Sequence, residues 1–334
     1  MKSIYLLFLS ALLSLSSFAH NEPWTASRPD GHAPISVMGD HMHAMGEWMV
    51  SYRYMTMEMK GLLDGSNDTT STTAGSKFPR SMMGDMLPKE MTMNMHMFGA
   101  MHAISDQWTL MCMINYLDNE MTMQNGDMME TSGLGDLKIG GLYDLARWKD
   151  GRRSHLSLGL SAPTGSIDEK FGTKTVGYGM QLGSGTWDFQ PAITYLGQTE
   201  NYSYGAQLGG VLRIGDNDQG YTLGNQVDAT VWGARKITDA LSASLKIDHT
   251  CQEEVDGSHK GISTMQRTMT PAKDPAHQGR DLTSVGLGLN YYFQSGVLKG
   301  HRIAAEWETP IHQKVNGVQL ALDSSWTLGW QYAW

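Results

Sequence analysis

Large apolar side chains alternate with small or polar ones along much of this chain, most clearly at its carboxyl end. In SSWTLGWQYAW a Trp, Leu or Tyr occupies every second position from Trp326 to Trp334, with Thr, Gly, Gln and Ala between them. Successive side chains of a β-strand point to opposite faces of the sheet, whereas a helix would scatter them around its axis. The segment therefore predicts a strand with one aromatic face.

Similar alternation marks eleven further segments. They are residues 48–59, 91–103, 108–123, 134–145, 155–162, 186–195, 202–213, 221–234, 241–248, 285–291 and 302–309. Short turns are expected at residues 104–107, 196–201, 235–239 and 294–299, and long loops at 61–90, 163–185 and 250–281. An even number of antiparallel strands, with short and long connections alternating, is typical of a single-chain transmembrane β-barrel. We predict an all-β fold, one antiparallel barrel of about 12 strands, with both termini in the periplasm.

Aromatic residues at the ends of the apolar faces support a barrel in the outer membrane. Rings at these positions suit the two membrane interfaces, and the final Trp334 resembles the terminal signature of bacterial outer-membrane barrels. A soluble β-sandwich is the alternative fold. Its exposed faces would normally carry charge, and its buried faces would favour Val, Ile and Leu.

The amino-terminal residues indicate export. Lys2 precedes an apolar run over residues 4–15 and a small-x-small site at residues 17–19, which together predict a secretory signal peptide cleaved after Ala19. No later stretch approaches the roughly 20 apolar residues of a transmembrane helix. We expect a signal peptide at residues 1–19, a periplasmic segment or plug at 20–45, and a Gram-negative outer-membrane barrel at 46–334.

Charge and cysteine content exclude several other classes of protein. The net charge is −9, which opposes binding to nucleic acid and anionic lipid headgroups. Cys112 and Cys251 are the two cysteines, too few for a disulfide framework. Cys112 is expected to face lipid and Cys251 to start a loop. The expected partners are outer-membrane lipid and either small apolar molecules or soft metal ions.

Two glycine-rich motifs carry a family resemblance. Residues 133–137 read GLGDL before a predicted strand, and residues 158–165 read LGLSAPTG at the end of the next. With GSGT at 183–186 and the aromatic last strand, they resemble the meta-pathway phenol-degradation family of outer-membrane transporters. Residues 33–43, APISVMGDHMH, resemble the opening of a Met-rich branch. The resemblance implies a pore for small molecules, often apolar aromatics, and supplies no catalytic residues.

Methionine is concentrated in the first third of the chain. Of the 25 methionines, 22 fall between Met1 and Met129. In residues 48–59 the alternation places Arg53 inside the barrel together with Met55, Met57 and Met59. In residues 108–116 it places Met111 and Met113 inside as well. Methionine is therefore expected to line part of the lumen.

The stretch MTMNMHMFGAMH, residues 91–102, allows two orientations. Placing its methionines in the lumen matches the neighbouring strands but turns Thr92, Asn94 and His96 outward. The opposite orientation gives the methionines to lipid, and a bulge at Gly99 could switch between the two. We favour methionines inside, with Thr92 and Asn94 above the membrane, because only about 9–11 residues of each strand need to cross it.

A methionine-lined wall has two chemical interpretations. Met is an adaptable apolar side chain that would suit apolar solutes, and its thioether is also a soft ligand for Cu(I) or Ag(I). In DHMHAM, an extended backbone would put His41, His43 and Met45 on one face, although this segment could equally be a periplasmic lead-in or plug. His96 and His102 are expected at a membrane interface or in a loop rather than as ligands. The candidate soft-metal ligands are His41, His43, Met45, Met55, Met57, Met59, Met93, Met95 and Met97.

Catalytic function has little support in the sequence. The chain contains no GxSxG, HExxH, P-loop or paired CxxC motif. The expected inward-facing charges are Asp136, Lys138, Asp188, Arg213, Asp228, Lys246, Glu306 and Glu308. Charges of both signs are common in a solvated lumen. We expect a channel or transporter without a required cofactor, with soft-metal binding or efflux as one alternative and a barrel enzyme as another.

Overall fold

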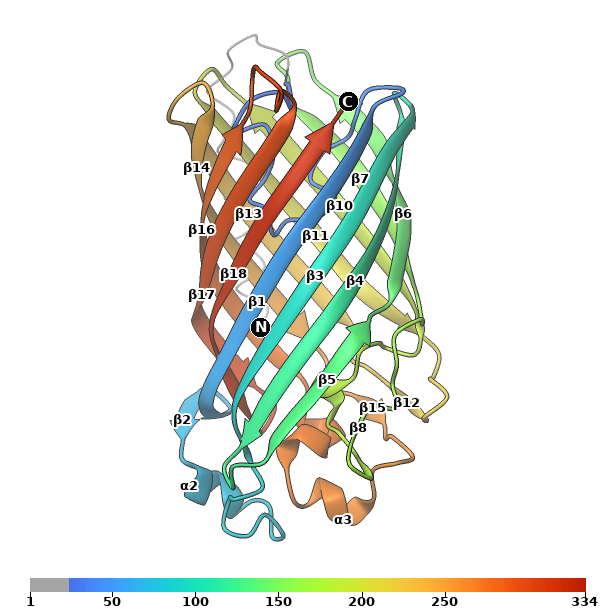
Figure 1. Ribbon diagram of the computed structural model, residues 1–334, viewed down its shortest axis with the longest axis vertical. Helices are drawn as coiled ribbons and strands as arrows, with labels where there is room; N and C mark the ends of the chain where they lie inside the picture. The colour runs from blue at the N-terminus through green and yellow to red at the C-terminus, as the bar shows by residue number, and fades with distance from the viewer. Residues whose placement is uncertain (1–23) are drawn as a thin grey trace.

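The computed structural model describes residues 24–334, so the predicted signal peptide lies outside the described residues. One sheet of 14 strands dominates this part of the chain (Figure 1). The short strands β2 (Asn67–Thr69) and β5 (Met128–Leu134) pair only with ends of β1 and β4. The other twelve strands of the described chain close into an antiparallel barrel through pairing of β1 with β18. The predicted fold class is confirmed.

The barrel strands follow one another in chain order. They are β1 (Trp48–Asp64), β3 (Pro88–Ser105), β4 (Trp108–Met123), β6 (Leu137–Arg147), β7 (Arg153–Ala162), β10 (Trp187–Gln198), β11 (Tyr202–Ile214), β13 (Gln226–Lys236), β14 (Leu241–Gln252), β16 (Arg280–Tyr292), β17 (His301–Val315) and β18 (Val318–Ala333). The loops carry α2 (Ser71–Gly75), α3 (Thr264–Arg267), η1 (Tyr178–Met180), η2 (Pro271–Lys273), η3 (Pro275–His277), β8 (Lys170–Phe171), β9 (Lys174–Thr175), β12 (Tyr221–Thr222) and β15 (Asp256–Gly257). No helix among the described residues is long and apolar enough to cross a membrane.

One predicted strand begins later than its alternation indicated. Residues 221–234 were expected as one strand, but β13 begins at Gln226, and Tyr221 belongs to the short loop strand β12. The side chain of Tyr221 is fully buried among Tyr178, Val255 and Ile262 in the long loops. Packing between loops, rather than the sheet, therefore accounts for this apolar position. Cys251, expected at the start of a loop, instead pairs with Val227 within β14.

The glycine motifs build a turn network where the long loops begin. Asp136 accepts hydrogen bonds from the backbone N–H groups of Gly165 and Ser184, at 2.9 Å each. Thr164 Oγ1 donates to the carbonyl of Gly135 at 3.0 Å and accepts from the N–H of Leu137 at 2.9 Å. These contacts tie the GLGDL, PTG and GSG segments together. Their role in the fold is to hold two loops against the barrel rim.

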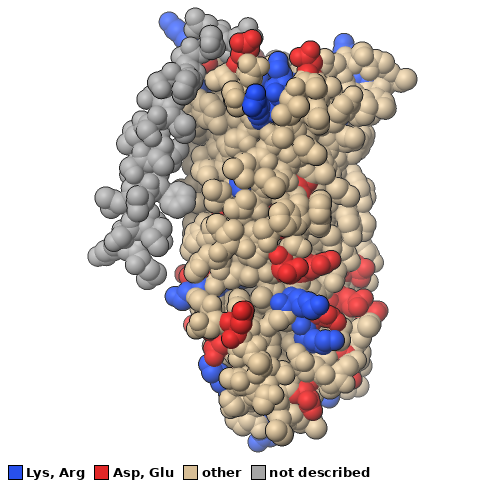
Figure 2. Space-filling model, turned by 90° about the vertical axis from the view of Figure 1, so that its left-hand side faces the viewer, with Lys and Arg blue, Asp and Glu red and all other residues tan. Residues whose placement is uncertain are grey.

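The outer surface is largely apolar between charged ends. Figure 2 shows a broad band with few charged side chains, bordered by charged groups towards both ends of the molecule. Outward-facing Leu208, Leu245 and Leu287 are about half exposed to what would be lipid, at 54%, 50% and 53%. Such an apolar band is the surface that an outer-membrane barrel presents to the bilayer.

The polar side chains on the outer face of β3 are paired with tyrosines. The hydroxyl of Tyr54 donates to Asn94 at 2.8 Å, and the hydroxyl of Tyr52 lies 2.8 Å from Nδ1 of His96. His102 stacks on Trp48, as expected of an interfacial residue. Strand β3 has 18 residues, longer than the roughly 9–11 needed to cross the membrane. The strand is therefore long enough for its polar outward half to extend past the apolar band.

Candidate functional site: the lumen and its amino-terminal segment

The segment before β1, residues 24–46, lies inside the barrel towards the end where β18 finishes at the carboxyl terminus (Figure 1). Its polar groups bond to inward-facing side chains on many strands. Gln198 of β10 exchanges two hydrogen bonds with the backbone of Thr25, at 2.9 and 3.1 Å. Gln207 of β11 donates to the carbonyl of Met38, and His155 of β7 lies 2.8 Å from the carbonyl of Gly39. We call residues 24–46 the inner segment.

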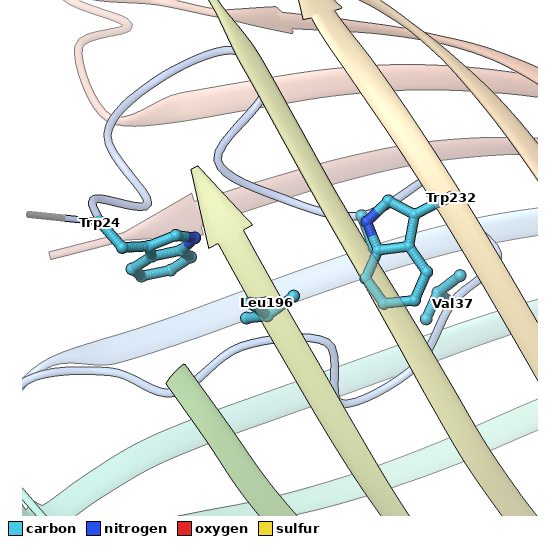
Figure 3. Close-up of a cluster of buried hydrophobic side chains, with 5 residues drawn as sticks. Trp24, Val37, Leu196 and Trp232 are labelled. Carbon is cyan, nitrogen blue, oxygen red and sulfur yellow. The ribbon is translucent and has the colours of Figure 1, made fainter. Parts of the chain in front are cut away.

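Apolar packing fastens the inner segment to one side of the wall. Trp24, Ala33 and Val37 of the segment pack with Leu196 of β10 and Trp232 of β13 in a buried cluster, part of which Figure 3 shows. On the opposite side Ile35 sits over Gly329 of β18. A Cβ atom at position 329 would lie 2.4 Å from Cγ1 of Ile35. Gly329 therefore leaves the space that Ile35 occupies.

Three buried cations hold the inner segment by its backbone and by one serine. Arg302 of β17 is 2% exposed and donates to the carbonyls of Ala26, Arg28 and Pro29, at 2.8 to 2.9 Å. Arg53 of β1 donates to the carbonyl of Ile35 at 3.0 Å. Lys246 of β14 donates to the hydroxyl of Ser36 at 2.6 Å. The three cations belong to three different barrel strands, so the segment is attached to the wall at three separate places.

The methionines of β1, β3 and β4 face the lumen. Met55 pairs with Met95, and Met57 pairs with Met93; directly opposite residues in a sheet share a face. The pairing is continuous on both sides of Gly99, without the bulge considered above. The preferred orientation of residues 91–102 is thereby confirmed, and Asn94 and His96 point outward.

A cavity of about 730 Å³ lies between this methionine wall and a polar wall. The methionine wall consists of Met55, Met57, Met59, Met91, Met93, Met97, Met111, Met113 and Met121. The polar wall consists of Gln207, Gln226, Asp228, Thr230, Lys246, Asp248, Thr250, Arg280 and Glu308. Ser36, Val37 and Met38 of the inner segment line one end, and loop residues such as Pro271 and Gln278 line the other. The cavity therefore offers one soft apolar face and one hydrogen-bonding face.

Ion pairs organise the polar wall. Lys246 contacts the carboxylates of Glu308 at 2.7 Å, Glu306 at 2.9 Å and Asp248 at 3.3 Å. Glu306 also accepts the backbone N–H of Ser36 at 2.9 Å. Arg213 forms a further ion pair with Asp188 between β11 and β10. Five of the eight charges expected to face inward, Asp188, Arg213, Lys246, Glu306 and Glu308, thus form strand-bridging pairs, and one group of them also holds the inner segment. Asp136 and Asp228 accept hydrogen bonds from uncharged donors instead.

A family model described as "Putative MetA-pathway of phenol degradation" matches residues 98–306, more than half of the chain. The chain belongs to this family. The match includes the GLGDL and PTG motifs and ends within β17. No curated protein sequence matched the chain.

Solved structures of outer-membrane barrels are similar to this member of the phenol-degradation family. It is similar to the COG4313 outer membrane channel from Pseudomonas putida F1, with a TM-score of 0.64, 13% identity, and coverage of 89% of this chain and 99% of that one. A Pseudomonas aeruginosa FadL homologue gives a TM-score of 0.43 at 9% identity, covering 93% and 95% of the two chains. The KdgM porin gives 0.41 at 9% identity, covering 85% and 98%. The first likeness supports the fold, and the predicted outer-membrane location holds.

The structure separates the soft-metal candidates of this family member into two groups. Met55, Met57, Met59, Met93 and Met97 line the cavity. Met95 lies on the same face, and its sulfur accepts a hydrogen bond from Asn115 at 3.6 Å.

The second group lies in the inner segment, where the expected His41–His43–Met45 face is not formed. The rings of His41 and His43 are 4.8 Å apart and buried, whereas Met45 is 69% exposed. A turn begins at Met45, whose N–H bonds to Asp106 at the barrel rim. That turn breaks the extended geometry on which the three-residue set depended.

Sequence reasoning missed His32 and Asp40. The rings of His32 and His41 are 3.8 Å apart, and Asp40 Oδ1 lies 2.9 Å from Nδ1 of His41. Burial, followed by the charge of nearby Arg302, holds the pKa of His32 well below its usual value. Burial likewise lowers the pKa of His43 to about 3. His32 is nine residues before His41, so no short motif connected them.

Proposed function

We propose that this protein is an outer-membrane channel for small molecules that combine an apolar body with a hydrogen-bonding group. The single observation that carries the proposal is the cavity with a methionine wall facing a polar wall. Its volume of about 730 Å³ is within the range of roughly 300–1,000 Å³ that small-molecule sites occupy. Small phenol-like aromatics have a ring for one wall and a hydroxyl for the other, which agrees with the family description.

For a solute to cross the barrel, the inner segment must either move out of the lumen or leave an open passage between itself and the barrel wall. As described, its residues line the periplasmic end of the cavity and bond to at least five barrel strands. We therefore infer that residues 24–46 act as a plug. This plug overlaps the periplasmic segment or plug predicted at residues 20–45. The proposal includes no catalytic step and no resident cofactor.

Uptake of an apolar dye by whole cells tests the channel. N-phenylnaphthylamine is suitable because the lipopolysaccharide leaflet excludes it and it fluoresces in apolar surroundings. Thr230→Trp would insert a bulky ring into the cavity, so dye uptake by cells producing this variant should fall towards that of cells lacking the protein. The matched control is Leu208→Trp, which places the same ring on the lipid-facing surface of the neighbouring strand.

Equal uptake by the two tryptophan variants would show that the dye does not pass through the cavity. Both variants must first reach the outer membrane in equal amounts, as judged by a heat-modifiable gel band. Phenol and a non-aromatic alcohol of similar size can then compete with the dye. Competition by phenol alone would support the aromatic substrate class, whereas equal competition would limit the proposal to small amphiphilic molecules.

Soft-metal transport is a second candidate, supported by a separate observation. Three adjacent strands direct nine thioethers at one cavity, and thioethers bind Cu(I) and Ag(I) in preference to Zn(II) or Mg(II). Retention of Ag(I) by the purified barrel, lost on exchange of methionine for leucine, would favour this function. Dye transport without Ag(I) binding would leave the small-molecule channel.

A further inference from the structure

Three histidines pack against one another within the inner segment. The ring centroids of His32 and His41 are 3.8 Å apart, and those of His41 and His43 are 4.8 Å apart. Their exposed fractions are 8%, 0% and 4%. Imidazoles are seldom grouped in this way in a purely apolar core, because each ring brings two polar nitrogens that need partners.

One nitrogen of each ring has no partner in the described chain. His32 Nδ1, His41 Nε2 and His43 Nε2 are buried and accept or donate no hydrogen bond. Leaving a buried polar atom unpaired costs about 1–3 kcal/mol. Three such atoms in one small cluster therefore indicate a ligand that the protein alone does not supply.

Carboxylates lie near the other nitrogen of two of the rings, and the one on His41 is within hydrogen-bond distance. Asp40 Oδ1 lies 2.9 Å from Nδ1 of His41, and Glu47 Oε2 lies 3.4 Å from Nδ1 of His43. Asp40 is itself fixed, because its second oxygen accepts the N–H of Ala33 at 2.8 Å. A carboxylate on one imidazole nitrogen sets the tautomer and leaves the other nitrogen free to bind a metal ion.

We propose that His32, His41 and His43 form a site for a divalent transition-metal ion of the Cu(II) or Zn(II) class, with Asp40 orienting His41. Ligand atoms of His32, Asp40 and His41 lie within 4.8 Å of one another, and the ring centroid of His43 is 4.8 Å from that of His41, so ring movements would bring the three nitrogens to a common ion. Three imidazoles form a borderline ligand set that suits Cu(II) and Zn(II) and does not suit Mg(II) or Ca(II). Met45 takes no part in this site.

The site is distinct from the methionine wall in ligand type. Imidazole nitrogens in the inner segment select borderline divalent ions, whereas thioethers on the barrel select soft monovalent ions. The inference is also independent of the transport function, since it concerns only the inner segment. Metal binding should link His32, His41 and His43 through one ion. It should therefore stabilise the conformation in which the inner segment is bound inside the barrel.

Binding of Cu(II) to the purified, refolded full-length mature protein tests the proposal. The metal content after gel filtration through a buffer containing glycine should be one Cu(II) per chain. Electron paramagnetic resonance should show hyperfine coupling to several imidazole nitrogens. His32→Gln and His41→Gln should each weaken Cu(II) binding at least 100-fold, and Asp40→Asn should weaken it roughly 10- to 100-fold because it orients a ligand.

Two control variants exclude other copper sites. His312→Gln removes an exposed histidine of β17 and should leave binding unchanged. His20→Gln tests copper binding at the mature amino terminus, where cleavage after Ala19 would expose a histidine. Loss of binding in His20→Gln but not in His41→Gln would overturn the proposal.

The parent protein also tests the proposal, without any risk of misfolding. If the parent retains neither Cu(II) nor Zn(II) after gel filtration, the cluster is not a metal site. If the parent binds Cu(II) but the spectrum shows oxygen ligands alone, the histidine ligand set is wrong. Binding of Mg(II) as tightly as Cu(II) would also contradict it.

Discussion

Replacing Arg302 by methionine should unseat the inner segment. The guanidinium is buried and donates three hydrogen bonds, of 2.8 to 2.9 Å, to backbone carbonyls of the segment. A hydrogen bond to a charged group contributes about 1.5–3 kcal/mol, and three bonds from one group are not fully additive. We therefore expect a loss of roughly 3–6 kcal/mol of seating energy.

A loss of this size changes the equilibrium strongly, since each 1.4 kcal/mol is about a tenfold change. The ratio of seated to unseated segment should fall roughly 10²- to 10⁴-fold. Methionine replaces most of the apolar stem of Arg302 and matches that stem in length, but it lacks the guanidinium group. The barrel wall should therefore remain intact while the segment loses its anchor.

Single-channel recording in planar bilayers measures the result. Arg302→Met should show more frequent and larger openings than the parent. Ser36→Cys, in a background of Cys112→Ala and Cys251→Ala, should also react faster with a water-soluble thiol reagent when Arg302 is replaced. Arg235→Met is the matched control, because Arg235 is exposed on β13 and contacts the ring of Tyr202 instead.

The same recordings can refute the argument. If Arg302→Met and the parent have the same open probability and the same labelling rate at position 36, the three hydrogen bonds do not determine seating. If open probability and labelling rate rise equally in Arg235→Met, the effect comes from loss of a positive charge in general and not from loss of the Arg302 hydrogen bonds.

Four further predictions follow from the same structure. Gly329→Val should displace Ile35 and raise conductance as Arg302→Met does; unchanged conductance would show that the segment can repack around the new side chain. Cysteine at Met57 should react with a water-soluble thiol reagent admitted through the lumen, and cysteine at Tyr52 should not; the reverse would place methionine against lipid. Exchange of the six methionines at positions 55, 57, 59, 93, 95 and 97 for leucine nearly conserves volume, so the barrel should assemble, and any Cu(I) retention due to the wall should be lost; undiminished Cu(I) binding would rule out these thioethers. Deletion of residues 331–334 removes part of the β18–β1 pairing and should reduce heat-modifiable barrel in the outer membrane; wild-type amounts would show that the final strand can close without it.

The sheet could be predicted because strand alternation is a local property. Each lipid-facing strand repeats large apolar residues every second position, and a one-residue shift would expose the wrong face. The orientation of residues 91–102 could be inferred for the same reason, since Arg53 on the neighbouring strand belonged inside. The exact start of β13 could not be predicted. Tyr221 continues the alternation of the strand, but its side chain is buried between the long loops and not on the barrel.

The lumen contacts were much less predictable than the sheet. The contact of Arg302 with Pro29 joins residues 273 positions apart, and neither residue belongs to a motif. The grouping of His32 with His41 depends on how an irregular segment folds back inside a barrel. Irregular backbone has no period that would place side chains on a face. The expected placement of His41, His43 and Met45 on one face was therefore wrong, while the expected placement of methionines along the lumen was right.

The methionine wall also exposes the protein to chemical oxidation. Peroxide or hypochlorous acid converts a thioether to a sulfoxide, which is polar, and the change is reversed only by dedicated reductases. Nine such groups face one cavity, and the outer membrane is the first barrier that an external oxidant meets. Oxidation would turn the apolar face of the cavity into a hydrated one. A channel that favours apolar solutes while its methionines are reduced would then favour water and ions. Its solute selectivity would therefore depend on how much oxidant the cell surface has met.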